Sequence, residues 1–325
     1  MLSRTADHLF WLSRYIERAE NTARMLDIAY QTSLQPQSAD ESEQTWRSLV
    51  SISELNGLFG SRYAQINARN VMEFMVADEN NLSSIFNCLR AARENARAVR
   101  GALTTEVWET MNQTWLEFRR LLRDGALARD PSQLFEWVKY RSHLSRGVTV
   151  GTMLQDEAFH FIRIGSFLER ADNTARLLDV KFYRQDQEQA QSQGQGEPEL
   201  PGHDAARDFY YWSAVLRSVS GFEIYRKVYS NVIQPEKVAE LLILRPDMPR
   251  SLSHCVTRMQ ANLKRVANGH SAETLRRVGR LEAELAFGRI DEILAEGLHP
   301  FLDGFLAEVA DLGVRISEDF LVPSA

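Results

Sequence analysis

Two segments of the chain carry nearly the same ionisable side chains at the same spacing. The first segment, residues 14–27, reads RYIERAENTARMLD, and the second, residues 166–179, reads SFLERADNTARLLD. Glutamate and arginine at fixed spacing can neutralise each other as ion pairs. A guanidinium can also bind a carboxylate or a phosphate through two parallel hydrogen bonds. The chemistry that these residues suggest is therefore ionic recognition.

The charges of each segment share one face of a helix. At about 100° per residue, Glu17, Asn21 and Arg24 point in nearly the same direction, with Phe10 above them and Ile28 below. The matching face of the second segment consists of Ile162, Glu169, Asn173, Arg176 and Val180. Apolar turns on both sides of the charges indicate a band inside the protein or at the floor of a groove. Charges in such a place must be paired, because an isolated buried ion is costly.

Two interpretations of this band are open. In the structural interpretation, Glu17 pairs with Arg176 and Glu169 pairs with Arg24 across a pseudo-twofold axis. Such pairs would fix the register of two packed helices. In the functional interpretation, the arginines line a groove and bind carboxylates or phosphates. The two interpretations are compatible if the pairing leaves unpaired the arginine that directly follows one of the two glutamates in the sequence.

We take the polar residues of both segments, with one nearby histidine, as the candidate ligand-binding site. These are Arg14, Glu17, Arg18, Asn21, Arg24, His160, Glu169, Arg170, Asn173 and Arg176. We expect the glutamates to hold the arginines in place. The arginines would then bind a carboxylate-bearing ligand or an acidic segment of a partner. No catalytic residue is assigned.

The histidine of this set also allows a metal interpretation. Glu157 and His160 have the Glu-x-x-His spacing of di-iron helical bundles. A duplicated metal site would need a second such pair, but Thr5 stands where the counterpart of Glu157 would be. We therefore expect no metal and no cofactor, and we place His160 and His8 in the core or the groove.

The other residues that could do chemistry indicate structural or surface roles. Cys88 and Cys255 form no CxxC pair, and we expect both to be buried as small apolar residues. The four arginines of residues 90–100 line one face, as a solvated surface, a basic wall of the groove or a docking surface for an acidic partner. The net charge is −6 and no nucleic-acid motif is present, so we expect no nucleic-acid partner.

The similarity of the two segments extends along the chain and indicates an internal duplication. Landmarks of the two halves keep one order: His8 and His160, Glu17 and Glu169, Trp46 and Trp212, Cys88 and Cys255. The offset between partners grows from 152 to 167 residues, because the second half contains a longer connection, the Gln- and Gly-rich segment 186–203. That composition is typical of a flexible surface linker. The sequence predicts a first repeat over residues 1–153 and a second over residues 154–325, together forming one compact unit.

Helices carry all of these residues. Glycine and proline are sparse, and the segments between them show helical periodicity rather than strand-like alternation. We predict an all-α helical bundle of about twelve helices, built from two pseudo-symmetric repeats that pack through their long first helices, residues 3–33 and 154–185. Prolines mark further boundaries: Asp130-Pro131 begins a helix, while Arg245-Pro246, Met248-Pro249 and His299-Pro300 separate helices.

The repeated motif resembles the alpha-E domain family, a bacterial all-helical family defined by a Glu-Arg motif. The resemblance rests on residues 15–24, YIERAENTAR, and on residues 167–176, FLERADNTAR. Residues 93–97, 156–160 and 212–218 match as well, so it covers nearly the whole chain apart from the linker.

The resemblance implies a place in a larger system. Members of this family are typically encoded beside a circularly permuted ATP-grasp ligase and a transglutaminase-like cysteine peptidase. Such neighbours imply a system that makes and trims amide bonds on a small peptide, with this chain as their helical partner. The family has no established catalytic residues. The resemblance therefore singles out only the residues of its Glu-Arg motif, which are Glu17-Arg18 and Glu169-Arg170 in this sequence.

We therefore expect a non-catalytic binding or scaffold subunit, with its groove between the two Glu-Arg helices and with the ATP-grasp ligase and the transglutaminase-like protein as partners. One alternative is an enzyme that acts on the peptide or its amide product through His160, Glu157 and Glu169, with or without a metal. Another is a structural adaptor without a pocket. No stretch is apolar enough to cross a membrane and residues 1–18 lack a signal-peptide pattern, so we expect a cytoplasmic protein.

Overall fold

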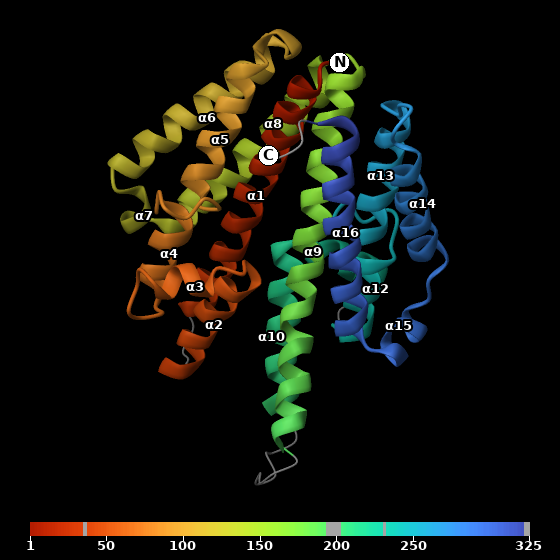
Figure 1. Ribbon diagram of the computed structural model, residues 1–325. Helices are drawn as coiled ribbons and strands as arrows, with labels where there is room; N and C mark the ends of the chain where they lie inside the picture. The colour runs from red at the N-terminus through yellow and green to blue at the C-terminus, as the bar shows by residue number, and fades with distance from the viewer. Residues whose placement is uncertain (35–37, 193–202, 230–231, 322–325) are drawn as a thin grey trace.

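The computed structural model describes residues 1–34, 38–192, 203–229 and 232–321, and every regular element within them is a helix (Figure 1). The predicted all-α class is confirmed. The first half contains α1 (Ser3–Ser33), α2 (Ala39–Ile52), α3 (Asn56–Gly60), α4 (Ala68–Val76), α5 (Ile85–Ala98), the 3₁₀ helix η1 (Arg100–Ala102), α6 (Thr105–Arg123), α7 (Ala126–Arg129) and α8 (Pro131–Thr152). The second half contains α9 (Glu157–Ser192), α10 (His203–Ser218), α11 (Phe222–Val228), α12 (Pro235–Ile243), α13 (Leu252–Arg265), α14 (Ala272–Phe287), α15 (Ile290–Glu296) and α16 (Leu298–Phe320). None of these helices is long and apolar enough to cross a membrane.

The predicted number of helices, about twelve, was too low. Helices α3, α7, α11 and α15 contain only 5, 4, 7 and 7 residues. An apolar pattern needs a window of about 11 residues to show the helical period, so helices this short escape it. The predicted linker also begins later than expected, because residues 186–192 continue α9 to Ser192. Glutamine and glutamate are good helix formers, which explains the extension; residues 193–202 lie outside the described part.

Local signals explain several helix ends. Asp130 caps the start of α8, which opens on the predicted proline. Pro246 and Pro249 lie between α12 and α13, as predicted. Pro300 was expected between helices but lies in the first turn of α16. Proline is tolerated there because the first N–H groups of a helix have no partner within it; the actual break is at Gly297, where φ is 105°.

The two longest helices, α1 and α9, lie side by side at the centre and run in the same direction (Figure 1). Helices α5 and α8 pack against α1, and α13 and α16 pack against α9 in the same way. Most of the packing of each half is thus against its own long helix, while α10 also contacts α1 and α2 also contacts α9. The long first helices form the contact between the halves, as predicted.

Two hydrophobic cores flank this central contact. One consists of residues from α1 to α8, including the fully buried Trp46. The other consists mainly of residues from α9 to α16, including the fully buried Trp212, and is joined by Leu9 and Phe10 of α1. The charged band of the two long helices lies between these apolar regions.

Both halves also share an unusual turn. Among the described residues, Glu54 and Ser220 are the non-glycine residues with positive φ, at 55° and 53°. Glu54 follows the end of α2 and Ser220 follows the end of α10, so the same left-handed turn ends corresponding helices. This parallel supports the internal duplication, which itself stays a prediction, as do the boundaries of the two repeats.

Helices α1 and α9 approach each other so closely at Gly165 that no side chain fits there. A Cβ atom at this position would lie 2.3 Å from the carbonyl oxygen of Phe10 and 2.4 Å from Oγ of Ser13. One of these atoms belongs to the backbone and cannot move without shifting α1. Gly165 therefore sets the spacing of the two helices beside the charged band.

We predict that Gly165→Ala lowers the free energy of unfolding by about 1–3 kcal/mol, because the methyl group forces the helices apart. Gly147→Ala is the matched control: Gly147 is also helical, but an added Cβ would meet nothing within 4 Å. It should raise the free energy of unfolding by about 0.5–1 kcal/mol. Denaturant unfolding of both variants checks this; equal effects would contradict the close contact.

Candidate functional site

Two reciprocal ion pairs join α1 and α9. Glu17 accepts hydrogen bonds from Nε and Nη2 of Arg170, both at 2.8 Å. Glu169 accepts hydrogen bonds from Nε of Arg18 at 2.6 Å and from its Nη2 at 3.1 Å. The two glutamates are only 1% and 2% exposed. The glutamate of each Glu-Arg dipeptide is thus gripped in a bidentate pair by the arginine of the other.

The predicted partners of the two glutamates, Arg24 and Arg176, do not reach them, so that pairing was wrong. Parallel helices in register bring residues of the same level together, and each predicted partner lies seven residues further along, about 10 Å along the axis. Arg24 instead bonds to Glu20, with Nε 2.8 Å from Oε1. Arg176 bonds to Asp172 at 2.9 Å and to Glu54 at 2.6 Å.

A third carboxylate, Glu20, extends the pairs into a network. Glu20 is fully buried and accepts hydrogen bonds from Nη2 of Arg250 at 2.6 Å, from Oγ of Ser142 at 2.6 Å and from Arg146. Arg146 lies on α8, and Arg250 lies just before α13. Both also reach Glu17, at 3.2 Å and 3.1 Å. Glu17 and Glu20 therefore share arginines that come from both halves of the chain.

The complete set contains more arginines than carboxylates. Glu169 also accepts a hydrogen bond from Nε of Arg14 at 2.8 Å. We call the following residues the ionic cluster: Glu17, Glu20, Glu169, Arg14, Arg18, Arg24, Arg146, Arg170 and Arg250. Six arginines share three carboxylates, so three positive charges of the cluster lack a negative counterpart in the described part of the chain.

The surroundings of the three glutamates keep them ionised. Burial raises the pKa of Glu17, but the charges of Arg170 and Arg250 outweigh burial and lower that pKa from 4.5 to about 2. Burial opposes the pKa shifts of Glu20 and Glu169 too, and their neighbouring arginines again lower both pKa values. The three glutamates therefore stay ionised throughout the physiological pH range.

The excess of positive charge is visible at Arg250. Burial is the largest influence on the pKa of this guanidinium and lowers it; Glu20 and Glu17 raise the pKa, the nearby Arg170 and Arg24 lower it, and the net result is a lowered pKa. A buried guanidinium that lies beside other positive charges would be stabilised by an additional anion. The ionic cluster thus favours a negatively charged ligand.

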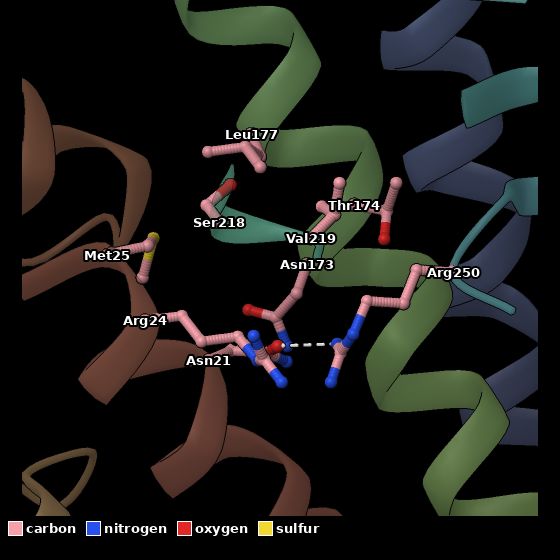
Figure 2. A pocket seen from close by; sticks show the side chains of 9 residues that line it. All are labelled: Asn21, Arg24, Met25, Asn173, Thr174, Leu177, Ser218, Val219 and Arg250. Atoms are coloured by element: carbon pink, nitrogen blue, oxygen red, sulfur yellow. Dashed lines mark hydrogen bonds between the residues drawn. The ribbon is translucent and has the colours of Figure 1, made fainter. Parts of the chain in front are cut away.

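A hollow opens beside the cluster, between α1, α9 and the end of α10 (Figure 2). We call it the inter-helix hollow; its volume is about 270 Å³ out to the solvent-open mouth, and its lining residues are Asn21, Arg24, Met25, Asn173, Thr174, Leu177, Ser218, Val219 and Arg250. Most of this volume is open to solvent, and only about 20 Å³ admits the centre of a water-sized group, so the hollow can take the end of one small chemical group rather than a long chain.

Hydrogen-bond donors gather at one side of the inter-helix hollow. Oδ1 of Asn21 accepts a hydrogen bond from Nη1 of Arg250 at 3.0 Å (Figure 2). Nδ2 of Asn21 is buried and has no hydrogen-bond partner among the described residues. Arg24 extends into the same region, while Met25 and Leu177 make part of the wall apolar. Donors beside an apolar wall suit a carboxylate that carries a small apolar group.

The structure brings most of the predicted site residues together. Six belong to the ionic cluster and two to the inter-helix hollow: Arg14, Glu17, Arg18, Arg24, Glu169 and Arg170, then Asn21 and Asn173. Arg176 turns away to Glu54. His160 lies elsewhere, with Nδ1 2.8 Å from Oδ1 of Asn262. Neither Arg18 nor Arg170 is free, so the condition under which the structural and functional interpretations would both hold is not met; ligand binding itself stays a prediction.

Sequence reasoning missed the part of the cluster outside the repeated motif. Glu20 carried a usable signal, since it lies four residues before Arg24, the spacing of a helical ion pair. Arg146 and Arg250 carried none, because neither belongs to a motif or to a matched landmark. His143, which lies 2.7 Å from Arg146, was missed as well. Burial is the main reason why the pKa of His143 is lowered, and the charges of Arg146 and Arg24 lower it as well.

The remaining candidate residues have structural partners. Cys88 and Cys255 are buried, as predicted, and burial raises the pKa of each thiol to about 12. Glu157 binds the N-terminal amine of Met1. The described residues contain no cluster of three or more His, Cys, Asp or Glu side chains arranged to hold a metal. Two of the arginines of residues 90–100 form ion pairs with Glu94.

Comparison with known proteins places this arrangement in a family. Residues 1–321 match Alpha-E, described as a predicted alpha-helical domain with a conserved ER motif. This chain belongs to the Alpha-E family. The Alpha-E domain is 25% identical over 334 aligned residues to an uncharacterized protein of Mycobacterium bovis and to two uncharacterized proteins of Mycobacterium tuberculosis. These alignments cover 94% of this chain but 35% of each relative, so the chain spans about a third of their length. No solved structure matches.

The reciprocal pairs give the ER motif of the Alpha-E domain a physical role. The dipeptides Glu17-Arg18 and Glu169-Arg170 each supply one carboxylate and one guanidinium to the contact between α1 and α9. Adjacent residues of a helix point about 100° apart and cannot pair with each other. A Glu-Arg dipeptide therefore pairs across a helix interface, where a second such dipeptide completes it.

Removal of a central carboxylate should destabilise the Alpha-E domain strongly. Glu17→Ala leaves the buried Arg170 without a carboxylate partner, so we expect a loss of about 3–5 kcal/mol in the free energy of unfolding. Asp172→Ala is the control, because it removes a partly exposed partner of Arg176 and should cost at most about 1 kcal/mol. Denaturant unfolding measures both losses; similar losses would contradict the central role of the ionic cluster.

The ionic cluster also predicts how stability depends on pH. A carboxyl group whose pKa is lower in the folded state stabilises the fold above its unfolded pKa and loses this contribution as the pH falls towards its folded pKa. For Glu17 these pKa values are 4.5 and about 2, a difference that corresponds to roughly 3 kcal/mol. We expect the free energy of unfolding to fall between pH 5 and pH 2, and to fall less steeply in Glu17→Gln. Parallel profiles of the two proteins would refute this assignment.

Proposed function

We propose that this Alpha-E domain is a non-catalytic binding or scaffold subunit whose inter-helix hollow holds a carboxylate group of a peptide or of a partner protein. One observation carries the proposal: the arginine-rich cluster borders an open hollow in which the buried Nδ2 of Asn21 lacks a hydrogen-bond partner among the described residues. An unsatisfied buried donor costs free energy that a ligand oxygen would recover. A carboxylate would satisfy this donor and offset the excess positive charge at once.

The alternative of a structural adaptor without a pocket explains less of the arrangement. Such an adaptor needs charges that neutralise each other, and Glu17 with Arg170 would meet that need. It does not need Arg24 and Arg250 to share one carboxylate, Glu20, at the edge of an open hollow. An excess of guanidinium groups at a solvent-accessible position favours ligand binding over a purely structural role.

The proposed partners follow from the family resemblance. We propose that the domain acts in the cytoplasm beside an ATP-grasp ligase and a transglutaminase-like protein, in a system that makes or modifies amide bonds. The products and substrates of such chemistry are peptides with free carboxylates, the group for which the hollow is suited. The relatives that extend well beyond the matched region support a domain that works next to other protein segments.

A short peptide tests the proposed ligand chemistry. We expect an N-acetylated dialanine with a free carboxylate to bind in isothermal titration calorimetry, and its C-terminal amide to bind at least about tenfold more weakly, because the charge is lost. Asn21→Leu should abolish binding of the free acid. Arg176→Ala, which removes a cation outside the hollow, should leave binding unchanged. Equal binding of acid and amide would refute the proposal.

A second experiment tests the proposed partners. The chain, co-expressed with the ligase and the transglutaminase-like protein encoded beside it, should purify as a complex that native mass spectrometry resolves by mass. Peptide retained in the complex should be lost in Asn21→Leu. Separate elution of all three proteins, with no retained peptide, would remove the scaffold part of the proposal.

A further inference from the structure

A second hollow lies on the other side of the ionic cluster, between α1, α8 and α9. Its lining includes Glu17, Ser145, Arg146, Arg163 and Ser166, and its volume is about 330 Å³ out to the solvent-open mouth. We call it the Arg163 hollow. It shares none of its lining residues with the inter-helix hollow. The two hollows therefore form separate sites at the two sides of one charged network.

Arg163 is the unusual residue of this hollow. It is half-buried, yet it forms no ion pair with a carboxylate and donates no hydrogen bond within residues 1–34, 38–192, 203–229 and 232–321. The carboxylate that acts on it is that of Glu17, which is already bonded to other arginines. The guanidinium is held in place by stacking on Phe167, 4.5 Å from the ring centroid. A positive charge is thus positioned at the hollow without being neutralised.

The surroundings of Arg163 disfavour its positive charge. Burial is the main reason why the pKa of Arg163 is lowered to about 10, and the neighbouring Arg170 and Arg146 lower it further. The guanidinium remains protonated at neutral pH, so Arg163 is a fourth cation near Glu17, which already pairs with Arg146, Arg170 and Arg250. A bound anion would relieve this repulsion.

Hydroxyl groups complete the set of donors. Ser145 on α8 and Ser166 on α9 are only 6% and 7% exposed, and neither side chain forms a hydrogen bond with another described residue. Within the described part of the chain, neither hydroxyl oxygen is among the fully buried atoms that lack a partner, so both are open to the hollow and can donate to a group bound there. The guanidinium of Arg163, unpaired among the described residues, and the two hydroxyls offer donors from both α8 and α9. Arg146, although already bonded within the ionic cluster and to His143, adds a positive charge beside them. This arrangement suits a tetrahedral oxyanion better than a planar carboxylate, which is bound best by one guanidinium edge.

The first half of the chain does not repeat this site. At the offset of 152 residues that relates the two Glu-Arg segments, the position of Arg163 corresponds to Trp11. Trp11 stacks with Arg14, whose guanidinium lies 4.7 Å from the ring centroid and bonds to Glu169. The arginine on the first side is neutralised, whereas the arginine on the second side is not. Packing of the long helices alone therefore does not require Arg163.

We propose that the Arg163 hollow binds a compact oxyanion of the phosphate class, as free phosphate or as the phosphoryl group of a small molecule. Arg163 and Arg146 supply the charge, and Ser145 and Ser166 supply neutral hydrogen bonds. The site is separate from the proposed carboxylate site, so either proposal can fail without the other.

Calorimetric titration with inorganic phosphate at constant ionic strength tests the site. We expect the wild-type protein to bind phosphate and Arg163→Gln to bind it at least about tenfold more weakly. Arg163→Gln without phosphate should melt at the same temperature as wild type or higher, because the uncompensated cation is removed. A purely structural role of Arg163 would lower the melting temperature instead. Arg176→Gln, on the same helix but outside the hollow, should bind phosphate like the wild type.

Two further arms keep the outcome clear. Ser166→Ala, a smaller change, should weaken phosphate binding even if Arg163→Gln folds poorly. Titration with O-phosphoserine distinguishes the sources, because tighter binding than that of phosphate identifies a phosphorylated molecule and equal or weaker binding identifies the free ion. The dialanine acid should bind Arg163→Gln as it binds the wild type. Absence of phosphate binding by the wild type, or unchanged binding by both variants, would overturn the proposal.

Discussion

The burial of paired charges between two hydrophobic cores is the constraint on which the rest of the structure depends. Glu17 and Glu169 are ionised deep inside the protein, where an unpaired charge would cost several kcal/mol. They are tolerated because Arg170 and Arg18 reach them in bidentate geometry from the opposite helix. The two long helices can therefore adopt only a register in which both pairs form, and Gly165 allows them to come close enough to do so.

This constraint also explains why the site is asymmetric in charge. Buried carboxylates attract guanidinium groups from every element that passes near them, and Arg146 and Arg250 join from α8 and from the connection before α13. Each added arginine satisfies a lone pair of a glutamate but brings a whole positive charge. The interior thus becomes well hydrogen-bonded and, at the same time, electropositive. An electropositive interior with openings on two sides is the physical basis for the proposed carboxylate and oxyanion sites.

Much of the fold and part of the site could be predicted from sequence. Apolar periodicity over long segments identified the long helices, and the repeated Glu-Arg motif identified the buried band, because both signals are local in the chain. The pairing within the band was predicted wrongly. Helical periodicity places Arg24 and Glu17 on one face, but it does not show at which level a neighbouring helix presents its arginines. A shift of two turns along an axis leaves the pattern on each helix unchanged.

The amino-acid sequence by itself determined that this protein is helical, that its charges lie in an apolar frame and that two similar segments carry them, since each follows from residue types at short range. Only the tertiary structure decided which charges meet. Arg146, Arg163 and Arg250 lie in segments without a motif and acquire their roles from distant neighbours. The balance of charge in a buried site is a sum over elements that are far apart in the chain, so it exists only after the helices have packed.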